Sequence, residues 1–584
     1  MRQNHLSIHS ENILPIIKKW LYSDKDIFLR ELISNATDAL NKTRIVLGSL
    51  EDGRINVSID NAAKTITIAD NGIGMTEEEV EKYIAQIAFS GAEEFVAKYK
   101  TQTEKDPMIG HFGLGFYSAY MVASRVTIDT LSYKPEATAV YWDCDGSSTY
   151  TIDKGERKTR GTTIVLHVDE QSLEYLEEAK LRELLTRHCH FMPFPIELNG
   201  KAIGNQEPLW MKNPSECTDS QYLSFYRQLF PLDPEPIFWI HLNVDYPFHL
   251  QGILYFPKIH RRFDANESTI KLFCNRVFVS DNCKDILPDY LMVLRGAIDS
   301  PDIPLNVSRS YLQVDKNVRQ LSAHISKKVS DRLNLLYKTD PQKYIEAWPD
   351  VEMIVKLGLL QDEKFYERIK ESLIWKTNQG NWICLPDTKK IFYSASENSP
   401  LLACYKEEVL LATTPIDTAV IQFLEDKCDI SFQRIDGALD EKLLDPTREK
   451  TLLDAEGKTE SGRIAEFIQK AVGVPVEAKS LSSDQTPALI VVDENQRRLR
   501  DYMTLTSGKP STMETKKTFV VNTNHKLIQT IARLNQKEPD LAASVAKGLY
   551  DLSLLSQREM DGTTIQEVIS RQTEVLEKMA ALLA

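Results

Sequence analysis

The sequence holds 584 residues, more than one hydrophobic core can organise, so we expect three or four domains. Its hydrophobic fraction of 42% and charged fraction of 26% are ordinary for a globular protein, which disfavours fibrous and disordered classes. The formal net charge of -14 disfavours a nucleic acid as the principal partner, because nucleic-acid binders usually carry a basic excess.

The chain shows no sign of export or membrane insertion. Its first twenty residues lack the apolar core and cleavage site of a signal peptide, and no stretch approaches the roughly 18 apolar residues of a membrane helix. The eight cysteines stand singly without a C-x-x-C pair, which suits a reducing compartment. We therefore expect a cytoplasmic protein with no membrane partner.

The first part of the chain predicts helices over a sheet. Residues 11–47 show helical spacing in two segments, and the alternating runs at 55–60 and 65–70 predict a β-hairpin. Residues 76–100 are expected to be helical and polar on one side, and the glycine cluster at 110–115 opens another helix. Strands follow at 125–131 and 161–168. We expect residues 1–205 to form a first domain with helices over an antiparallel sheet.

The rest of the chain predicts further mixed domains. Aromatic-rich strands are expected at 236–244, 248–256 and 270–279, followed by a long helical stretch from about 315 to 375. An alternation of strands and helices up to about 435 indicates a small α/β subdomain, and the polar stretch 446–462 marks the next boundary. We predict domains at 1–205, 206–446 and 447–584, and a multidomain α+β fold.

Four short segments carry candidate chemistry. Glu31, Asn35 and Asp38 share one face of a helix by their spacing, although acidic helix faces are commonly just solvated. Asp70 ends a strand before Gly72 and Gly74, where a carboxylate could accept a hydrogen bond from an exocyclic amine. An ordinary turn is the better explanation of that segment taken alone.

The other two segments involve the glycine cluster and a strand start. Gly110-x-x-Gly113-x-Gly115 offers free backbone N–H groups at a helix start, a natural anion site, but it is neither a P-loop nor a Rossmann motif. Thr162 could bond the same base edge as Asp70, or it could stand there for its strand propensity alone.

In this order and spacing the four segments match the Bergerat (GHKL) nucleotide-binding fold. RELISNATDAL, DNGIGM, IGHFGLGFYSAYMVA and RGTTIVLH closely resemble the signature segments of the heat-shock protein 90 chaperone family, bacterial HtpG type. Gyrase, mismatch-repair and histidine-kinase relatives share a sparser pattern. The resemblance continues into LRGAIDSPDIPLNVSRSYLQ at 294–313, which is similar to the family's middle-domain catalytic loop.

The resemblance implies an ATP-dependent chaperone with a Bergerat N-terminal domain, a two-part middle domain and a C-terminal dimerisation domain. Asn35 would ligate Mg²⁺, Asp70 would anchor adenine with Thr162, and Glu31 would orient or deprotonate the attacking water. Arg309 would reach the phosphates from the middle domain, with Gln313 as a second contact. The other nucleotide-binding residues implied are Asp38, Gly74, Met75, Ser90, Gly91, Gly110, Phe112, Gly113, Leu114, Gly115 and Phe116.

Three residues depart from the family pattern. Phe89 stands where many relatives have a basic residue, Tyr83 where many have an asparagine that touches nucleotide, and His111 where glutamine is commoner. These departures concern the nucleotide contacts of a lid expected at about 76–113. They leave the core of the expected pocket unchanged.

The last helix predicts an interface. Ile565, Val568, Ile569, Gln572, Leu576, Met579 and Leu583 form one stripe, which suits either a core or a helix pair. The family resemblance favours a homodimer, with unfolded or partly folded proteins as clients. The chain ends in Ala-Leu-Leu-Ala without an acidic pentapeptide, so we expect no helical-repeat (TPR-type) co-chaperone at this tail.

Three other functional classes are alternatives to an ATP-dependent chaperone. A DNA-processing ATPase of the mismatch-repair or gyrase kind would need a basic groove, which the acidic balance disfavours. A histidine kinase would need a phosphoacceptor helix ahead of the ATP domain, where this sequence has only a few residues. A nucleotide-binding scaffold without turnover is disfavoured by the presence of both Glu31 and Arg309.

Overall fold

A computed structural model describes most of the chain, which divides into two compact units, Met1–Val329 and Ser330–Ala584. The described residues are 24–87, 89, 95, 99, 108–110, 113–204, 207–246, 248–258, 269–281, 286–303, 316–399, 401–402, 405–437, 444–448, 459–507, 513, 515–557, 560 and 565–581. The predicted helix before residue 24 lies outside them.

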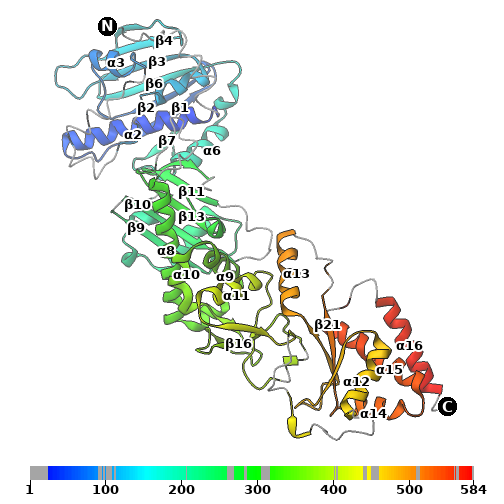
Figure 1. The fold of residues 1–584 in the computed structure, drawn as a ribbon. Coiled ribbons are helices and arrows are strands. Elements are labelled where there is room, and N and C mark those ends of the chain that lie inside the picture. The colour runs from blue at the N-terminus through cyan, green and yellow to red at the C-terminus, as the bar shows by residue number, and fades with distance from the viewer. Residues whose placement is uncertain are drawn as a thin grey trace, which may run out of the picture. The chain divides into compact units, whose positions relative to one another are not determined.

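The first unit begins with an eight-stranded sheet in the order β5-β4-β3-β6-β2-β1-β7-β8 (Figure 1). The predicted hairpin is confirmed as β1 (Ile55–Asp60) and β2 (Thr65–Asp70), and the predicted strands near 125 and 161 as β3 (Ala123–Leu131) and β6 (Gly161–Val168). The sheet is not wholly antiparallel, because β1 pairs in parallel with β7 (Ile196–Leu198). Helix α6 (Glu178–Cys189) connects β6 to β7 and returns the chain, so that β7 runs in the same direction as β6 and β1.

Helix α2 (Ile27–Leu47) lies along this sheet and is buried on two sides. Phe28, Leu32 and Leu40 are buried in the core that α2 shares with the strands, as their spacing predicts. Glu31 and Asp38, on the polar face, are buried as well. Gly48 ends the helix in the left-handed conformation, at φ 82°. An acidic face that is buried beside a sheet indicates a site rather than a solvated surface.

A second sheet of the first unit has the order β12-β11-β13-β10-β9. The predicted single strand at 270–279 is a hairpin instead, made of β11 (Thr269–Cys274) and β12 (Val277–Ser280). Asn275 and Arg276 turn the chain with φ values of 52° and 66°, the backbone of a tight two-residue loop. Val277 belongs to the core of the first sheet, so the hairpin packs against the N-terminal part of the unit.

The second unit confirms the predicted α/β alternation. Three parallel strands in the order β17-β16-β18 pack with helix α11 (Asp417–Lys427). A further sheet in the order β19-β21-β20 carries the C-terminal helices. Phe392 and Ile435 share one hydrophobic core with Leu489 and Val520, which joins the two sheets within this unit.

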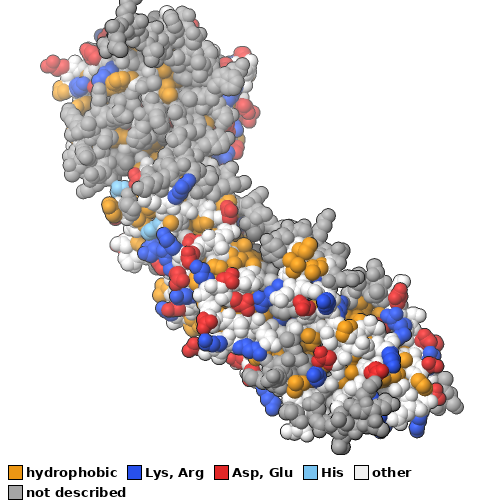
Figure 2. Space-filling view, viewed as in Figure 1, with side chains coloured by type: hydrophobic (Ala, Val, Ile, Leu, Met, Phe, Trp, Pro, Cys, Tyr) orange, Lys and Arg blue, Asp and Glu red, His pale blue; other side chains and the backbone are white. Residues whose placement is uncertain are grey.

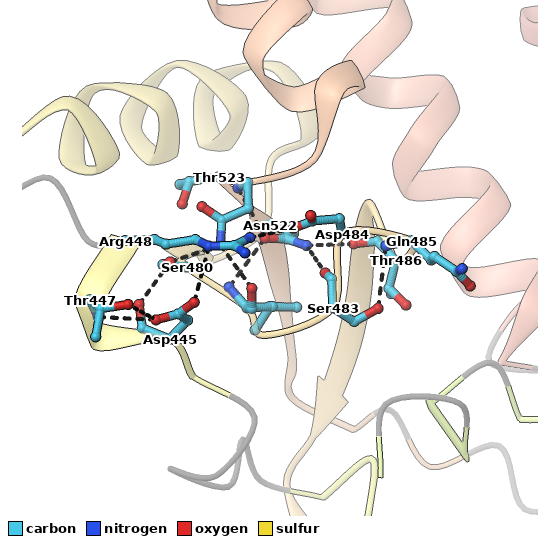
Figure 3. Close-up of polar contacts among 12 residues, drawn as sticks. Asp445, Thr447, Arg448, Ser480, Ser483, Asp484, Gln485, Thr486, Asn522 and Thr523 are labelled. Carbon is cyan, nitrogen blue, oxygen red and sulfur yellow. Dashed lines mark hydrogen bonds and ion pairs between the residues drawn. The ribbon is translucent and has the colours of Figure 1, made fainter. Parts of the chain in front are cut away.

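A polar cluster fixes the segment that enters the C-terminal sheet (Figure 3). The Asn522 side chain accepts a hydrogen bond from the Leu481 amide and donates to the carbonyls of Ser483 and Thr486 at 2.7 and 2.9 Å. Asp445 and Ser480 exchange two hydrogen bonds of 2.8 and 3.0 Å. Because every polar group of the buried Asn522 amide is satisfied, the loop between β19 and β20 is held in one conformation.

The predicted stripe on the last helix, α16 (Ile565–Ala581), is divided between two environments. Val568 is buried and Gln572 donates to the Gly548 carbonyl of α15 (Pro539–Ser556) at 2.9 Å, whereas Ile569 and Leu576 are 60% and 66% exposed. Neighbouring residues point about 100° apart on a helix, which allows Val568 to be buried while Ile569 is exposed. Leu583 and the side chain of Met579 lie outside the described structure.

The other elements of the first unit are α3 (Glu77–Tyr83), η2 (Gly115–Met121), β4 (Val140–Cys144), β5 (Thr151–Lys154), η3 (Leu173–Leu176), β8 (Lys201–Ile203), η4 (Leu209–Met211), η5 (Pro214–Glu216), α7 (Asp219–Leu229), β9 (Phe238–Val244), β10 (Leu250–Phe256), η7 (Asp289–Leu291) and β13 (Arg295–Asp299), while α8 (Lys316–Thr339) crosses the division between the units. Those of the second unit are α9 (Pro341–Gln361), α10 (Glu363–Ile369), η8 (Lys370–Ser372), β14 (Trp375–Lys376), β15 (Trp382–Ile383), β16 (Lys390–Ser394), β17 (Leu410–Leu411), β18 (Ser431–Arg434), η11 (Pro446–Arg448), α12 (Glu460–Val472), β19 (Val476–Lys479), β20 (Ala488–Val492), α13 (Glu494–Ser507), β21 (Lys517–Asn522) and α14 (Lys526–Leu534). None of the helices in the described ranges combines the length and the apolar character needed to cross a membrane.

Candidate nucleotide-binding site

Asp70 and Thr162 lie directly opposite each other on neighbouring strands, β2 and β6. Both are 7% exposed. One carboxylate oxygen of Asp70, Oδ1, accepts a hydrogen bond of 2.8 Å from the Gly72 amide. The structure therefore brings together two residues that lie far apart in the sequence and that were predicted to bond the same base edge.

Burial raises the pKa of the Asp70 carboxyl to about 6. The amide of Gly72, the charge of Arg157 and the backbone of Thr162 each oppose this rise. The Arg157 guanidinium donates to the Asp70 carbonyl at 2.5 Å and also bonds the Thr163 hydroxyl. These two hydrogen bonds hold the end of β2 to β6. Buried carboxylates with raised pKa values are often found at ligand sites, because a bound ligand can replace part of the hydration that burial removes.

Thr130 is a pocket residue that the sequence did not point to. It is fully buried on β3, and its hydroxyl accepts from the Met75 amide at 3.0 Å and donates to the Gly161 carbonyl at 3.1 Å. Its hydroxyl oxygen lies 3.0 Å from that of Thr162. Only the pairing of β3 with β6 places these groups together, so no local sequence signal could have identified Thr130.

Gly74 occupies a position that no other residue can take. Its φ is 62°, and a Cβ atom there would overlap the Leu131 carbonyl. The neighbouring Ile73 amide donates to the Ala39 carbonyl of α2 at 3.1 Å. The segment that follows Asp70 therefore lies in close contact with both β3 and α2.

The polar face of α2 meets the glycine segment. The Asp38 carboxylate accepts hydrogen bonds from the Ile109 and Gly110 amides, each at 2.7 Å. A Cβ on Gly110 would lie 3.5 Å from Asn35 Oδ1, and one on Gly115 would lie 2.6 Å from Glu31 Oε2. The three predicted helix residues therefore lie along the glycine segment, with Asp38 and Asn35 near Gly110 and Glu31 near Gly115.

Glu31 forms an ion pair with its neighbour in the chain. Arg30 donates to Glu31 Oε1 from Nε and Nη2 at 3.2 and 3.0 Å, and both side chains are buried. The other oxygen, Oε2, faces Gly115. The pair leaves one carboxylate oxygen directed toward the glycine segment.

Tyr83 and Phe89, two departures from the family pattern, pack on each other. Their rings stack with centroids 6.1 Å apart, and the Lys82 ammonium lies 5.4 and 5.2 Å from them. Gly113, with φ 63°, passes so close to the Phe89 backbone that a Cβ would overlap it. The aromatic pair therefore lies against the glycine segment.

The remaining predicted residues are placed as follows. Phe116 is buried edge-on against Trp142, with ring centroids 5.8 Å apart, and Leu114 and Met75 pack against the same core. Ser90, Gly91, His111, Phe112, Arg309 and Gln313 lie outside the described residues.

The donor set fits a nucleotide with a magnesium ion. Mg²⁺ keeps water and phosphate oxygens and needs few protein ligands, so one amide oxygen such as Asn35 Oδ1 is sufficient. Among the described residues no group of three or more His, Cys, Asp or Glu could hold a metal by itself.

Comparison with known families decides the assignment. Residues 24–186 match the family model described as histidine kinase-, DNA gyrase B- and HSP90-like ATPase, and residues 199–580 match the family model described as Hsp90 protein. The chain belongs to the Hsp90 family. Its sequence resemblance to that family is thereby confirmed, as are the multidomain α+β class and the general ATPase assignment.

Similar curated proteins extend over nearly the whole chain. The chaperone protein HtpG of Bacteroides fragilis is 40% identical over 605 residues, which cover 96% of this chain and 88% of that protein. The HtpG proteins of Porphyromonas gingivalis and Geobacter sulfurreducens are 40% and 30% identical, over 94% and 98% of this chain and 87% and 97% of their own lengths. An Hsp90-family ATP-dependent chaperone is thus the supported function, and the DNA-processing alternative is disfavoured.

Proposed function

We propose that this Hsp90-family chain binds ATP with Mg²⁺ against α2 and hydrolyses it slowly, in a site that residues beyond the first sheet complete. The main support for this proposal is the buried pair of Asp70 and Thr162 beside α2. Asp70 Oδ1 accepts from the Gly72 amide, and a carboxylate has several acceptor positions, so the exocyclic amine of adenine would donate to one of the others. The Thr162 hydroxyl bonds the same edge of the base, while Gly74, Met75 and Phe116 line the ring.

Phosphates would lie along the glycine segment. Gly110, Gly113 and Gly115 offer backbone N–H groups, and Asp38 holds the start of the segment through two amides. Asn35 Oδ1 would ligate the magnesium ion, which neutralises phosphate charge and orients the phosphates when bound. Asp38 contributes as a support of the segment, and Ser90, Gly91, Phe112 and Leu114 remain predicted contacts.

Glu31 is the proposed acceptor of a proton from the attacking water. Arg30 holds Oε1, which leaves Oε2 directed toward the segment where the phosphates would lie. A positioned base of this kind contributes about 10²–10⁴ in rate. Arg309 and Gln313 are proposed to complete the site from the middle domain, and such an arginine supplies on the order of 10³–10⁵. A site that needs two parts of the chain turns over only when they dock, so hydrolysis is gated by closure.

The proposed client surface includes helix α13. Leu499 and Met503 are about half exposed there, and Figure 2 shows hydrophobic side chains gathered over this helix. Exposed apolar side chains in a group suit binding of unfolded or partly folded proteins. We further propose a cytoplasmic homodimer that uses α16, with domains at 1–205, 206–446 and 447–584. Nucleic acid, membrane and a TPR-type co-chaperone at the tail are not proposed as partners.

The test compares wild type with Glu31→Ala and Glu31→Gln in steady-state ATPase and nucleotide-binding assays. We expect both variants to bind ATP while hydrolysis falls by at least about a hundredfold. Glu31→Gln keeps an oxygen that can accept the Arg30 hydrogen bonds, so it separates loss of the base from loss of those hydrogen bonds. Full turnover in Glu31→Gln would remove Glu31 from its proposed role. A wild type that does not hydrolyse ATP would overturn the proposal as a whole.

A further inference from the structure

The hairpin turn between β11 and β12 is strained. Asn275 and Arg276 both have left-handed backbones, and tight loops of this type usually carry glycine at the second position. Asparagine tolerates this conformation, whereas arginine does not adopt it readily. Strain of this kind persists only where surrounding contacts hold the backbone in place.

A buried carboxylate supplies that restraint. Asp299, at the end of β13, accepts a hydrogen bond of 3.0 Å from the Arg276 amide through Oδ2. Asp299 is itself buried beneath the hairpin. The tip of the turn is therefore fixed to the central strand of the second sheet, and Asn275 projects from a rigid base.

Asn275 reaches across to the glycine segment of the nucleotide site. Its side-chain Nδ2 donates to the Met108 carbonyl at 3.1 Å. The next two amides, those of Ile109 and Gly110, donate to Asp38 of α2. This short stretch of backbone is thus held on one side by the helix of the nucleotide site and on the other by the middle part of the first unit.

We propose that Asn275 is a positioning residue that couples the placement of the β11–β12 hairpin to the start of the phosphate-binding segment. The inference rests on the proposed ATPase function. A shift of the hairpin displaces the Met108 carbonyl, and Ile109 and Gly110 follow because they adjoin it in the chain. Conversely, phosphates that order the segment favour the docked hairpin, because coupling between two sites is reciprocal.

The test uses the full chain with Asn275→Gly. Glycine keeps the left-handed backbone and removes only the amide side chain, so the variant folds. Loss of one neutral hydrogen bond that is made in the active arrangement lowers kcat about three- to tenfold. Hydrogen exchange at the Ile109 and Gly110 amides becomes faster, while the Kd for adenosine, which lacks phosphates, is unchanged. Asn275→Asp, which has no donor, changes kcat and exchange in the same direction.

The matched control is Asn199→Gly. Asn199 also has a left-handed backbone in a hairpin, at φ 50°, but its side chain accepts from the Ile59 amide and donates to Glu178, neither of which belongs to the glycine segment. We expect wild-type kcat and wild-type exchange at Ile109 and Gly110 in this variant.

Unchanged exchange and kcat in Asn275→Gly overturn the proposal, and so does an equal loss in Asn199→Gly, which would indicate a general stability effect. If wild type lacks ATPase activity, the proposed function fails separately, and the exchange measurement still decides whether Asn275 restrains the segment.

Discussion

Asp70 combines burial with a negative charge, and its carboxylate is oriented by backbone groups. The Gly72 amide occupies Oδ1, and the register of β2 and β6 directs the side chain toward Thr162. A charged carboxylate in this environment is costly, as its raised pKa indicates. We therefore attribute the presence of this residue to what it binds, and two predictions test this.

Asp70→Asn should abolish adenine-nucleotide binding. The variant oxygen would remain with the Gly72 amide, so the new amide nitrogen would face the exocyclic amine, donor against donor. We expect affinity to fall by at least about a hundredfold, with no loss of thermal stability because a costly buried charge is removed. Asp60→Asn is the matched control, since Asp60 also ends a strand and accepts from following amides, but in an exposed turn. Unaltered calorimetric affinity in Asp70→Asn would refute the adenine anchor.

Adenosine affinity should depend on pH through Asp70. The pKa of this carboxyl is about 6 in the folded chain against an ordinary value of 3.8, so the stability contributed by this group falls as pH rises from about 4 to about 6 and then stays low. Binding runs the opposite way, because only the ionised carboxylate accepts from the amine. We expect about tenfold weaker adenosine binding at pH 5 than at pH 8. Calorimetry with adenosine avoids the titration of phosphates, and a flat profile would contradict the assignment.

At the scale of single elements, the segment after β2 depends on one glycine. Gly74→Ala places a Cβ on the Leu131 carbonyl in a left-handed backbone, so either β3 or the segment must move. We expect loss of nucleotide affinity and an earlier thermal transition. Gly48→Ala is the control, because Gly48 has a similar φ of 82° with nothing within 4 Å of its Cβ position. That variant should cost only about 1–2 kcal/mol of backbone strain. Equal effects of the two substitutions would show that strain, not the close contact, matters at Gly74.

At the scale of the whole molecule, α15 and α16 expose several large apolar side chains. Ile569 and Leu576 on α16 and Leu552 and Leu555 on α15 are each about half exposed or more, while Gln572 of α16 bonds the Gly548 carbonyl of α15. Such a surface suits association with a second copy, as the sequence predicts for this helix.

Ile569→Glu combined with Leu576→Glu should convert the proposed dimer to a monomer. Two charges on each chain would be buried without partners in the interface, which is strongly unfavourable. Light scattering should then report the mass of one chain instead of two. Leu335→Glu, at a residue that is 50% exposed on α8, is the control and should leave the mass unchanged. A double variant that remains dimeric would place the interface elsewhere.

The sequence by itself determined the family and the strands β1, β2, β3 and β6 of the first sheet, and it proposed most residues of the candidate site. These follow from local patterns, since helical spacing placed Glu31, Asn35 and Asp38 on one face and strand alternation ended at Asp70. Only the tertiary structure decided that Asp38 holds the Ile109 and Gly110 amides, that Thr130 joins Thr162, and that Asn275 reaches Met108. Each of these contacts joins residues that are distant in the chain, and their partners are selected by strand register and packing, which leave no periodic trace in the sequence.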